Sequence, residues 1–124
     1  MTTGRQRDRG QATVELALAL PLVCLLLFGI VQVAVIGRDQ LAVQLAAREA
    51  ARAAAASADL GTGSAAAHRA VALRPLDVEI SESSGTVTAT VRYTDHTDVP
   101  LIGALLPDVV LTATVTMAIE PPSR

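Results

Sequence analysis

The sequence predicts an α+β fold: a long N-terminal helix, transmembrane in its first half, followed by a small three-stranded antiparallel sheet. Three observations support this prediction. No charged residue occurs in the 22 positions from Leu16 to Gly37. An alanine-rich stretch without glycine or proline follows, from Arg38 to Leu60. After Pro75, apolar and polar residues alternate with the period of two that is typical of half-buried strands.

The uncharged segment is long enough to cross a bilayer once. At about 1.5 Å per residue it spans roughly 33 Å, against a hydrocarbon core of about 30 Å. Pro21 lies one turn inside, where a membrane helix tolerates the lost hydrogen bond. Three arginines precede the span (Arg5, Arg7 and Arg9), so the positive-inside rule predicts a cytoplasmic N-terminus. We therefore expect a basic cytoplasmic leader at 1–10, a transmembrane helix at 11–37, and an extracytoplasmic C-terminal part.

Two kinds of N-terminal processing compete with a retained span. A secretory signal could be cut after Ala17-Leu18-Ala19, but the apolar run continues well past that site and so favours retention. Processing as a lipoprotein at Cys24 is disfavoured, because Val23 directly precedes the cysteine at a position where a small residue is required. As the lone cysteine, Cys24 allows no intrachain disulfide or cysteine-based zinc site, and we expect a small buried hydrophobic residue there.

The helix is expected to continue beyond the membrane to about Ser57, within an extracytoplasmic extension at 38–60. Four alanines at a spacing of four would let another backbone approach closely (Ala42, Ala46, Ala50 and Ala54), although the general abundance of alanine explains the same pattern. Four larger residues share another side of this helix (Leu41, Leu45, Arg48 and Arg52).

Residues 61–124 are predicted to form a short helix and the sheet. Gly61 to Ser64 are expected to break the long helix before a second helix at Ala65–Leu73, with His68 on an exposed face. The predicted strands are Leu76–Ser81, Thr86–Tyr93 and Val109–Ile119, with a turn around Gly85 between the first two. So small a sheet needs a cover, which the outer half of the long helix or the second helix must supply.

Composition argues against several classes of function. The net charge is −2 and the excess of acids lies beyond Arg38, so no basic surface for nucleic acid is expected. Phe28 and Tyr93 are the only aromatic residues, too few for an aromatic-lined small-molecule site. No nucleophile and base can be paired, and the cluster from Asp95 to Asp98 is more typical of a turn than of a metal site. We expect no cofactor and no enzymatic activity.

Glu15 is the unexpected residue, since an acid near the start of an apolar segment calls for a partner. It could simply lie at the membrane interface, where the helix dipole favours a negative charge. Alternatively, a cut after Gly10 would leave a free amine on Gln11 and make Glu15 the fifth residue of the new chain. Amine and carboxylate could then pair within a chain or between neighbouring helices, more strongly as water is excluded.

Several motifs resemble a known family. The segment RDRG, then QATVE, then an apolar run containing Pro21, resembles the class III leader of type IV pilin-like proteins. The stretch GQATVELALALPLVCLLLFGIVQ, the following AREAAR helix and the final strand ending MAIE are similar to TadE-like minor pilins or pseudopilins of tight-adherence (Flp-type) pilus systems. Leu16 departs from the tyrosine that commonly follows the glutamate in major pilins, which favours a minor pilin or pseudopilin.

This resemblance implies a structural or assembly protein of the pilus. A prepilin peptidase would cut between Gly10 and Gln11, and Glu15 would act in assembly. The implied partners are that peptidase, pilin subunits, the assembly platform and membrane lipid. The alternative is a permanently anchored single-span protein with an extracytoplasmic interaction domain. Whether the protein joins the fibre or remains an assembly factor stays open.

Overall fold

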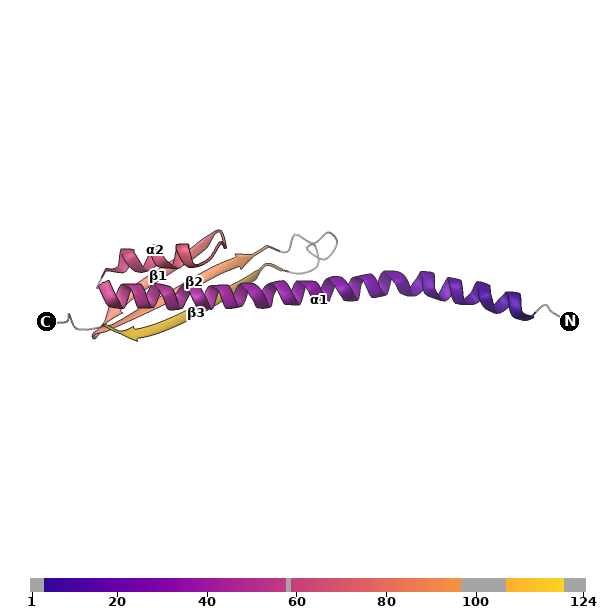
Figure 1. Cartoon of the computed structure of the whole chain (residues 1–124), viewed down its shortest axis with the longest axis horizontal. Helices are drawn as coiled ribbons and strands as arrows, with labels where there is room; N and C mark the ends of the chain where they lie inside the picture. Colours follow the sequence, from indigo (N-terminus) through magenta and orange to yellow (C-terminus); the bar gives the residue numbers. More distant parts are fainter. Residues whose placement is uncertain (1–3, 58, 97–106, 120–124) are drawn as a thin grey trace. The chain divides into compact units, whose positions relative to one another are not determined.

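The structure is a computed structural model that describes residues 4–57, 59–96 and 107–119. Its elements in chain order are α1 (Gly4–Ser57), α2 (Leu60–Ala70), β1 (Leu76–Ser83), β2 (Thr86–Asp95) and β3 (Val109–Ala118) (Figure 1). The predicted α+β fold, a long helix followed by a three-stranded antiparallel sheet, is confirmed. The chain forms two compact units, Met1–Val35 and Ile36–Arg124, and α1 contributes to both.

The helix α1 is continuous through Pro21 and Gly37. In the first unit its side chains from Gln11 onward are almost all exposed, including the apolar ones. Cys24 is a free cysteine and is exposed, so the expectation of a buried residue was wrong. The reason is that a single helix has no protein layer against which to bury an apolar side chain.

The second unit is built on a sheet with the strand order β1-β2-β3. β1 and β2 form the predicted hairpin, which closes at the pair Ser83 and Thr86. Ser84 and Gly85 between them have φ angles of 54° and 79°. Positive φ at both central residues is what a two-residue type I′ turn requires, and its twist matches that of the strands. β3 then pairs with β2, with Thr114 opposite Thr90.

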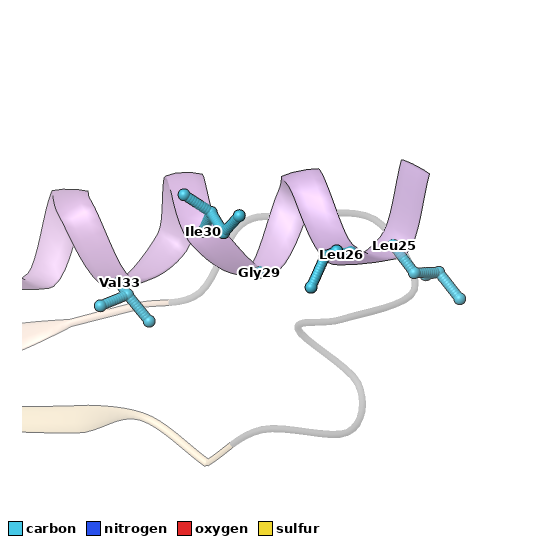
Figure 2. A pocket seen from close by; sticks show the side chains of 5 residues that line it. All are labelled: Leu25, Leu26, Gly29, Ile30 and Val33. Carbon is cyan, nitrogen blue, oxygen red and sulfur yellow. The ribbon is translucent and has the colours of Figure 1, made fainter. Parts of the chain in front are cut away.

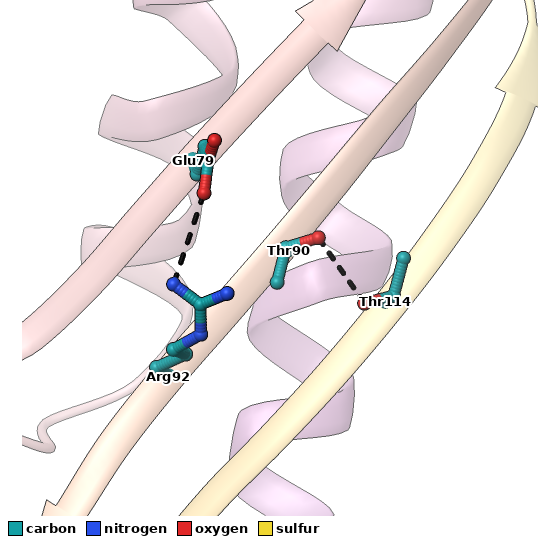
Figure 3. Close-up of polar contacts among 4 residues, drawn as sticks. All are labelled: Glu79, Thr90, Arg92 and Thr114. Carbon is teal, nitrogen blue, oxygen red and sulfur yellow. Dashed lines mark hydrogen bonds and ion pairs between the residues drawn. The ribbon is translucent and has the colours of Figure 1, made fainter.

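One face of the sheet carries the core, and both helices lie on that face (Figures 1 and 3). The inward residues Val87, Ala89 and Val91 of β2 are fully or almost fully buried. From α1, Ala46, Ala50 and Ala54 of the predicted stripe are completely buried, and Ala42 is half-buried. The stripe therefore packs within the protein, while Leu41 and Leu45 are exposed by 67% and 46%.

The start of α2 differs from the prediction. The break falls between Ser57 and Leu60, and Gly61 to Ser64 lie inside α2 rather than before it. Asp59 explains the new start because its carboxylate accepts hydrogen bonds from the Gly61 N–H (3.1 Å) and the Thr62 hydroxyl (2.7 Å). A side-chain cap of this kind satisfies backbone groups that a helix start leaves without partners.

The end of α2 also comes earlier than predicted, at Ala70 rather than Leu73. Arg74 closes this end by donating hydrogen bonds to the carbonyl oxygens of His68 (2.9 Å), Leu73 (2.6 Å) and Val71 (3.2 Å). His68 is half-buried, not exposed as expected. A basic side chain placed at the carbonyl end of a helix is electrostatically favourable.

At Gly63, α2 lies very close to α1. A Cβ at this position would lie 2.7 Å from the Ala50 carbonyl oxygen, 2.9 Å from the Ala54 Cβ and 2.6 Å from the Ile80 Cδ1. The absence of a side chain at Gly63, together with the small alanines of α1, allows this approach. Glycine is thus needed here for packing, and helix formation continues through it.

Candidate functional site

The candidate site is the N-terminal part of α1, where Gly10, Gln11 and Glu15 precede the apolar segment. Beyond these residues the helix exposes large apolar side chains on every side, among them Leu16, Leu18, Leu22 and Val33. The described part of α1 from Gly10 to Ser57 contains a window long and apolar enough to cross a membrane, and only 6% of it is buried. Such low burial distinguishes this segment from the core helix of a soluble protein.

Gln11 and Glu15 are brought together by the helix. The Gln11 side-chain amide donates a hydrogen bond to Glu15 Oε1 at 3.4 Å, across one helical turn. Residues four apart share a helix face, so this contact follows directly from their spacing. Both side chains are exposed. The Glu15 carboxylate therefore has a neutral amide donor on its own helix as a partner.

Gly10 stands at the start of the same turn and is exposed. A Cβ built at Gly10 would have nothing within 4 Å, so packing does not require glycine there. Glycine does lower the cost of leaving the helical conformation, by about 0.5–1 kcal/mol relative to alanine.

A shallow apolar depression lies further along the exposed helix. Its described lining consists of five residues of α1, all apolar (Leu25, Leu26, Gly29, Ile30 and Val33) (Figure 2). Gly29 provides the space, since a Cβ there would meet nothing within 4 Å. With no polar group in this lining, the depression suits an acyl chain or an apolar side chain rather than a polar ligand.

The cluster from Asp95 to Asp98 is only partly described. Asp95 is buried at the end of β2, whereas His96 is exposed and its Nδ1 lies 3.1 Å from Asp108 Oδ2. Thr97 and Asp98 lie outside the described residues. Among the residues of the three described ranges, no three His, Cys, Asp or Glu side chains are grouped as they would be around a metal ion.

The face of the sheet away from the helices is polar. Thr88 and Thr116 share a hydrogen bond between their hydroxyl groups at 2.9 Å, and Thr90 and Thr114 share one at 3.1 Å (Figure 3). Beside them, Arg92 forms an exposed ion pair of 3.8 Å with Glu79. Exposed pairs of this kind stabilise a sheet by at most about 1 kcal/mol each. This face has the character of a solvated surface and offers no catalytic arrangement.

Sequence reasoning identified Gly10, Gln11 and Glu15 but missed the contact between the last two. The signal was present, because a glutamine four residues before a glutamate on a helix is within hydrogen-bond reach. The apolar depression was also missed, because it depends on how the side chains around Gly29 fill space.

Residues 10–52 match the family model described as TadE-like protein. The matched segment begins at Gly10 and covers the apolar part of α1 and most of its alanine-rich continuation, 43 of the 124 residues. The resemblance to TadE-like proteins is thereby confirmed over this segment. The matched segment lies within the helix that is long and apolar enough to cross a membrane. No curated protein and no solved structure matches the chain.

Proposed function

We propose that the chain is a minor pilin or pseudopilin of a tight-adherence pilus, held in the membrane by α1 and cut by a prepilin peptidase between Gly10 and Gln11. The single observation that carries this proposal is an exposed apolar segment of α1 that follows Gly10 and Glu15 and lies within the match to the TadE-like model, which begins at residue 10. An exposed apolar helix of this kind is stable only in lipid or among other helices. A pilin-like subunit uses both environments in turn.

Glu15 has a specific part in this proposal. In the uncut chain its carboxylate is hydrogen bonded to the Gln11 amide. After the cut, the same Gln11 residue would carry a positively charged backbone amine one turn away. A charged donor binds a carboxylate roughly twice as strongly as a neutral amide does. Processing would therefore convert a weak local contact into an ion pair that can form within the chain or with a neighbouring subunit.

The alternative is a permanently anchored protein whose second unit binds a partner outside the membrane. Two observations favour it: α1 is continuous from Gly4 through Gly10, and Glu15 already has a partner in the uncut chain. In that case Glu15 is an acid at the membrane interface and needs no further contact.

The decisive experiment is to sequence the N-terminus of the protein purified from its native membranes. A chain that starts at Gln11 supports the pilin proposal, and one that starts at Met1 or Thr2 supports the permanent anchor. Gly10→Arg is expected to block the cut and leave a chain ten residues longer than the processed form. Gly4→Arg, which places the same side chain earlier in the leader, is the matched control and should be processed normally.

A further inference from the structure

One side of α1 remains uncovered in the second unit. It carries a row of four exposed side chains, which we call the outer stripe (Leu41, Leu45, Arg48 and Arg52). Residues at these spacings of three and four share one helix face, and this face lies opposite the alanines that are buried in the core. The second unit therefore leaves this row without a packing partner among the described residues.

The outer stripe has the composition of a contact surface. It combines apolar area with guanidinium groups, and arginine is enriched in protein interfaces. Within the three described ranges, neither Arg48 nor Arg52 forms an ion pair. Two outer stripes in the same orientation are a poor match for each other, because each arginine would meet its own counterpart. The stripe therefore requires an acidic surface as its partner.

The edge strand β1 carries such a surface. Asp77 and Glu79 are exposed on its face away from the helices, and β1 contains no basic residue. Glu79 Oε2 lies 3.8 Å from the Arg92 guanidinium group, but both side chains are exposed and a carboxylate can accept several hydrogen bonds (Figure 3). Asp77 forms no ion pair with any residue that the structure describes. A neighbouring molecule can thus reach both carboxylates at the edge of the sheet.

The acids of β1 lie beside the outer half of α1, at known heights along it. Within the second unit, β1 runs in the same direction as α1 (Figure 1). At one end, Gln40 of α1 donates a hydrogen bond to the Thr112 carbonyl oxygen, and Thr112 is in register, through β2, with Asp77. At the other end, Ala50 of α1 and Ile80 of β1 lie against the same point of α2. The carboxylates of β1 therefore lie at heights between Gln40 and Ala50.

The arginines of the stripe match these carboxylates in height, order and spacing. Helical side chains tilt toward the N-terminus, so the guanidinium groups of Arg48 and Arg52 reach back into the same range of heights. The two arginines are about 6 Å apart along the helix, and Asp77 and Glu79 are about 7 Å apart along the strand. Because α1 and β1 run in the same direction, the match holds between two copies in the same orientation.

We propose that the outer stripe of one copy docks on β1 of a second copy that has the same orientation. Arg48 then lies against Asp77 of the second copy, and Arg52 lies against Glu79. The same match places the leucines of the stripe beside Pro75, which is exposed just before β1. Charge-assisted hydrogen bonds between guanidinium and carboxylate groups fix the register, and the leucines add apolar contact.

A second copy suits this stripe because its orientation is already fixed by the membrane. Copies related by a rotation about the membrane normal keep α1 pointing the same way, so both helices enter one bilayer from the same side. They also keep the stripe and β1 at equal heights. The contact is heterologous: each copy uses its stripe toward one neighbour and its β1 toward another.

Cross-linking tests this contact in the full-length protein in membranes, with its lone cysteine replaced by alanine. Ala56 is exposed one turn beyond Arg52, and Ser81 is exposed two residues beyond Glu79. A copy with Ala56→Cys and a differently tagged copy with Ser81→Cys are expected to form a mixed dimer with a short bis-maleimide. Thr116→Cys replaces Ser81→Cys in the matched control, since Thr116 is exposed in the same row and face of the sheet but on β3. The control should give little mixed dimer.

Charge reversal tests whether the ion pairs carry the contact. Arg48→Glu with Arg52→Glu in the first copy should lower the mixed dimer by about tenfold or more, because like charges then face each other. Adding Asp77→Lys with Glu79→Lys in the second copy should restore the dimer. Glu82→Lys is the matched control, since Glu82 lies on the other face of β1, and it should leave the cross-link unchanged.

Three results would overturn the proposal: no mixed dimer, an equal yield with Thr116→Cys, or a yield that does not respond to charge reversal. A dimer between two Ala56→Cys copies would indicate a helix-to-helix contact instead and would also overturn it. The inference does not rest on the pilus proposal. The Gly10→Arg chain should cross-link as well as the unchanged chain, so the cross-link reports on the second unit and the N-terminal sequence reports on processing.

Discussion

At the scale of single residues, Glu15 is the side chain whose role depends most on the environment of the helix. Exposed to water, it needs no partner beyond Gln11. Among packed helices, an unpaired carboxylate would cost several kcal/mol, and breaking a desolvated pair costs roughly 3–5 kcal/mol. The proposed function thus assigns to Glu15 a contact made only in the assembly.

Glu15→Ala should therefore leave membrane insertion unchanged and reduce recruitment into the pilus. Removing a charge from an apolar segment favours insertion. Because about 1.4 kcal/mol corresponds to a factor of ten, loss of the pair should lower the recruited fraction by about tenfold or more. The measurement is the amount of protein in membrane and sheared pilus fractions. Glu82→Ala, in an exposed strand position, should recruit normally, and normal recruitment of Glu15→Ala would exclude the pairing role.

Gly63 gives a sharp prediction for stability. In Gly63→Ala the new methyl group would overlap the Ala50 carbonyl oxygen and the Ala54 Cβ, neither of which is the end of a flexible side chain. The helices must move apart, at a cost of about 1–3 kcal/mol. Thermal unfolding followed by the fluorescence of Tyr93, the single tyrosine in a chain without tryptophan, should show a lower midpoint.

Gly61→Ala is the control for that experiment. A Cβ at Gly61 would lie 3.5 Å from the nearest atom, Asp59 Oδ1, which is an ordinary contact. Replacing a helical glycine by alanine there should leave stability unchanged or raise it by up to about 1 kcal/mol. Equal effects of the two substitutions would show that close packing at Gly63 is unimportant.

Gly63 also shows why the start of the second helix was predicted wrongly. Two glycines within three residues, Gly61 and Gly63, are a strong local signal for a break. The helix forms nevertheless, because Asp59 caps its start and Gly63 is needed by the contact with α1. The cap was visible in the sequence, but the tertiary contact was not.

At the scale of elements, α2 depends on the charge of its cap. The hydrogen bond from the Thr62 hydroxyl, followed by that from the Gly61 N–H, holds the pKa of the Asp59 carboxyl below its usual value of 3.8. Since the pKa of Asp59 is lower in the folded chain, the cap contributes its full stability at pH values above the ordinary aspartate pKa. That contribution is lost as the pH falls through the lowered value.

Asp59→Asn tests this dependence because asparagine also caps helices but does not titrate. Between pH 6 and pH 3, the unfolding midpoint of the unchanged protein should fall further than that of Asp59→Asn, since the other carboxylates are common to both. Circular dichroism of the full chain follows the transition. Parallel pH profiles would show that the Asp59 carboxylate does not stabilise α2.

The strands were easier to predict than the helix ends. Alternation over Thr86 to Tyr93 and over Val109 to Ile119 specifies both the face and the approximate length of β2 and β3. The turn at Gly85 fixes the first hairpin because a positive φ is accommodated there. Near the candidate site, the acid before the apolar run and the resemblance to pilin leaders singled out Gly10, Gln11 and Glu15, and the roles of these residues stay predictions. The depression at Gly29 arises from neighbouring side-chain volumes that no periodic pattern records.

At the scale of the whole molecule, the apolar segment of α1 separates an arginine-rich start from a second unit with its own core. We expect the start to be cytoplasmic and the second unit to be outside, as the positive-inside rule predicts from Arg5, Arg7 and Arg9. The opposite orientation would require these three arginines to cross the bilayer, where each costs about 2.5–3.5 kcal/mol even by insertion scales.

Reporter fusions test this orientation directly. Alkaline phosphatase, which needs disulfide bonds that form outside the cytoplasm, should be active when fused after Arg124 and inactive when fused before Met1. Replacing Arg5, Arg7 and Arg9 by glutamate should reduce the activity of the C-terminal fusion, because the charge bias that holds the N-terminus inside is then lost. Activity at the N-terminal fusion in the unchanged chain would reverse the assigned orientation. It would also place Gly10 on the opposite side of the membrane from the one that the proposed processing assumes.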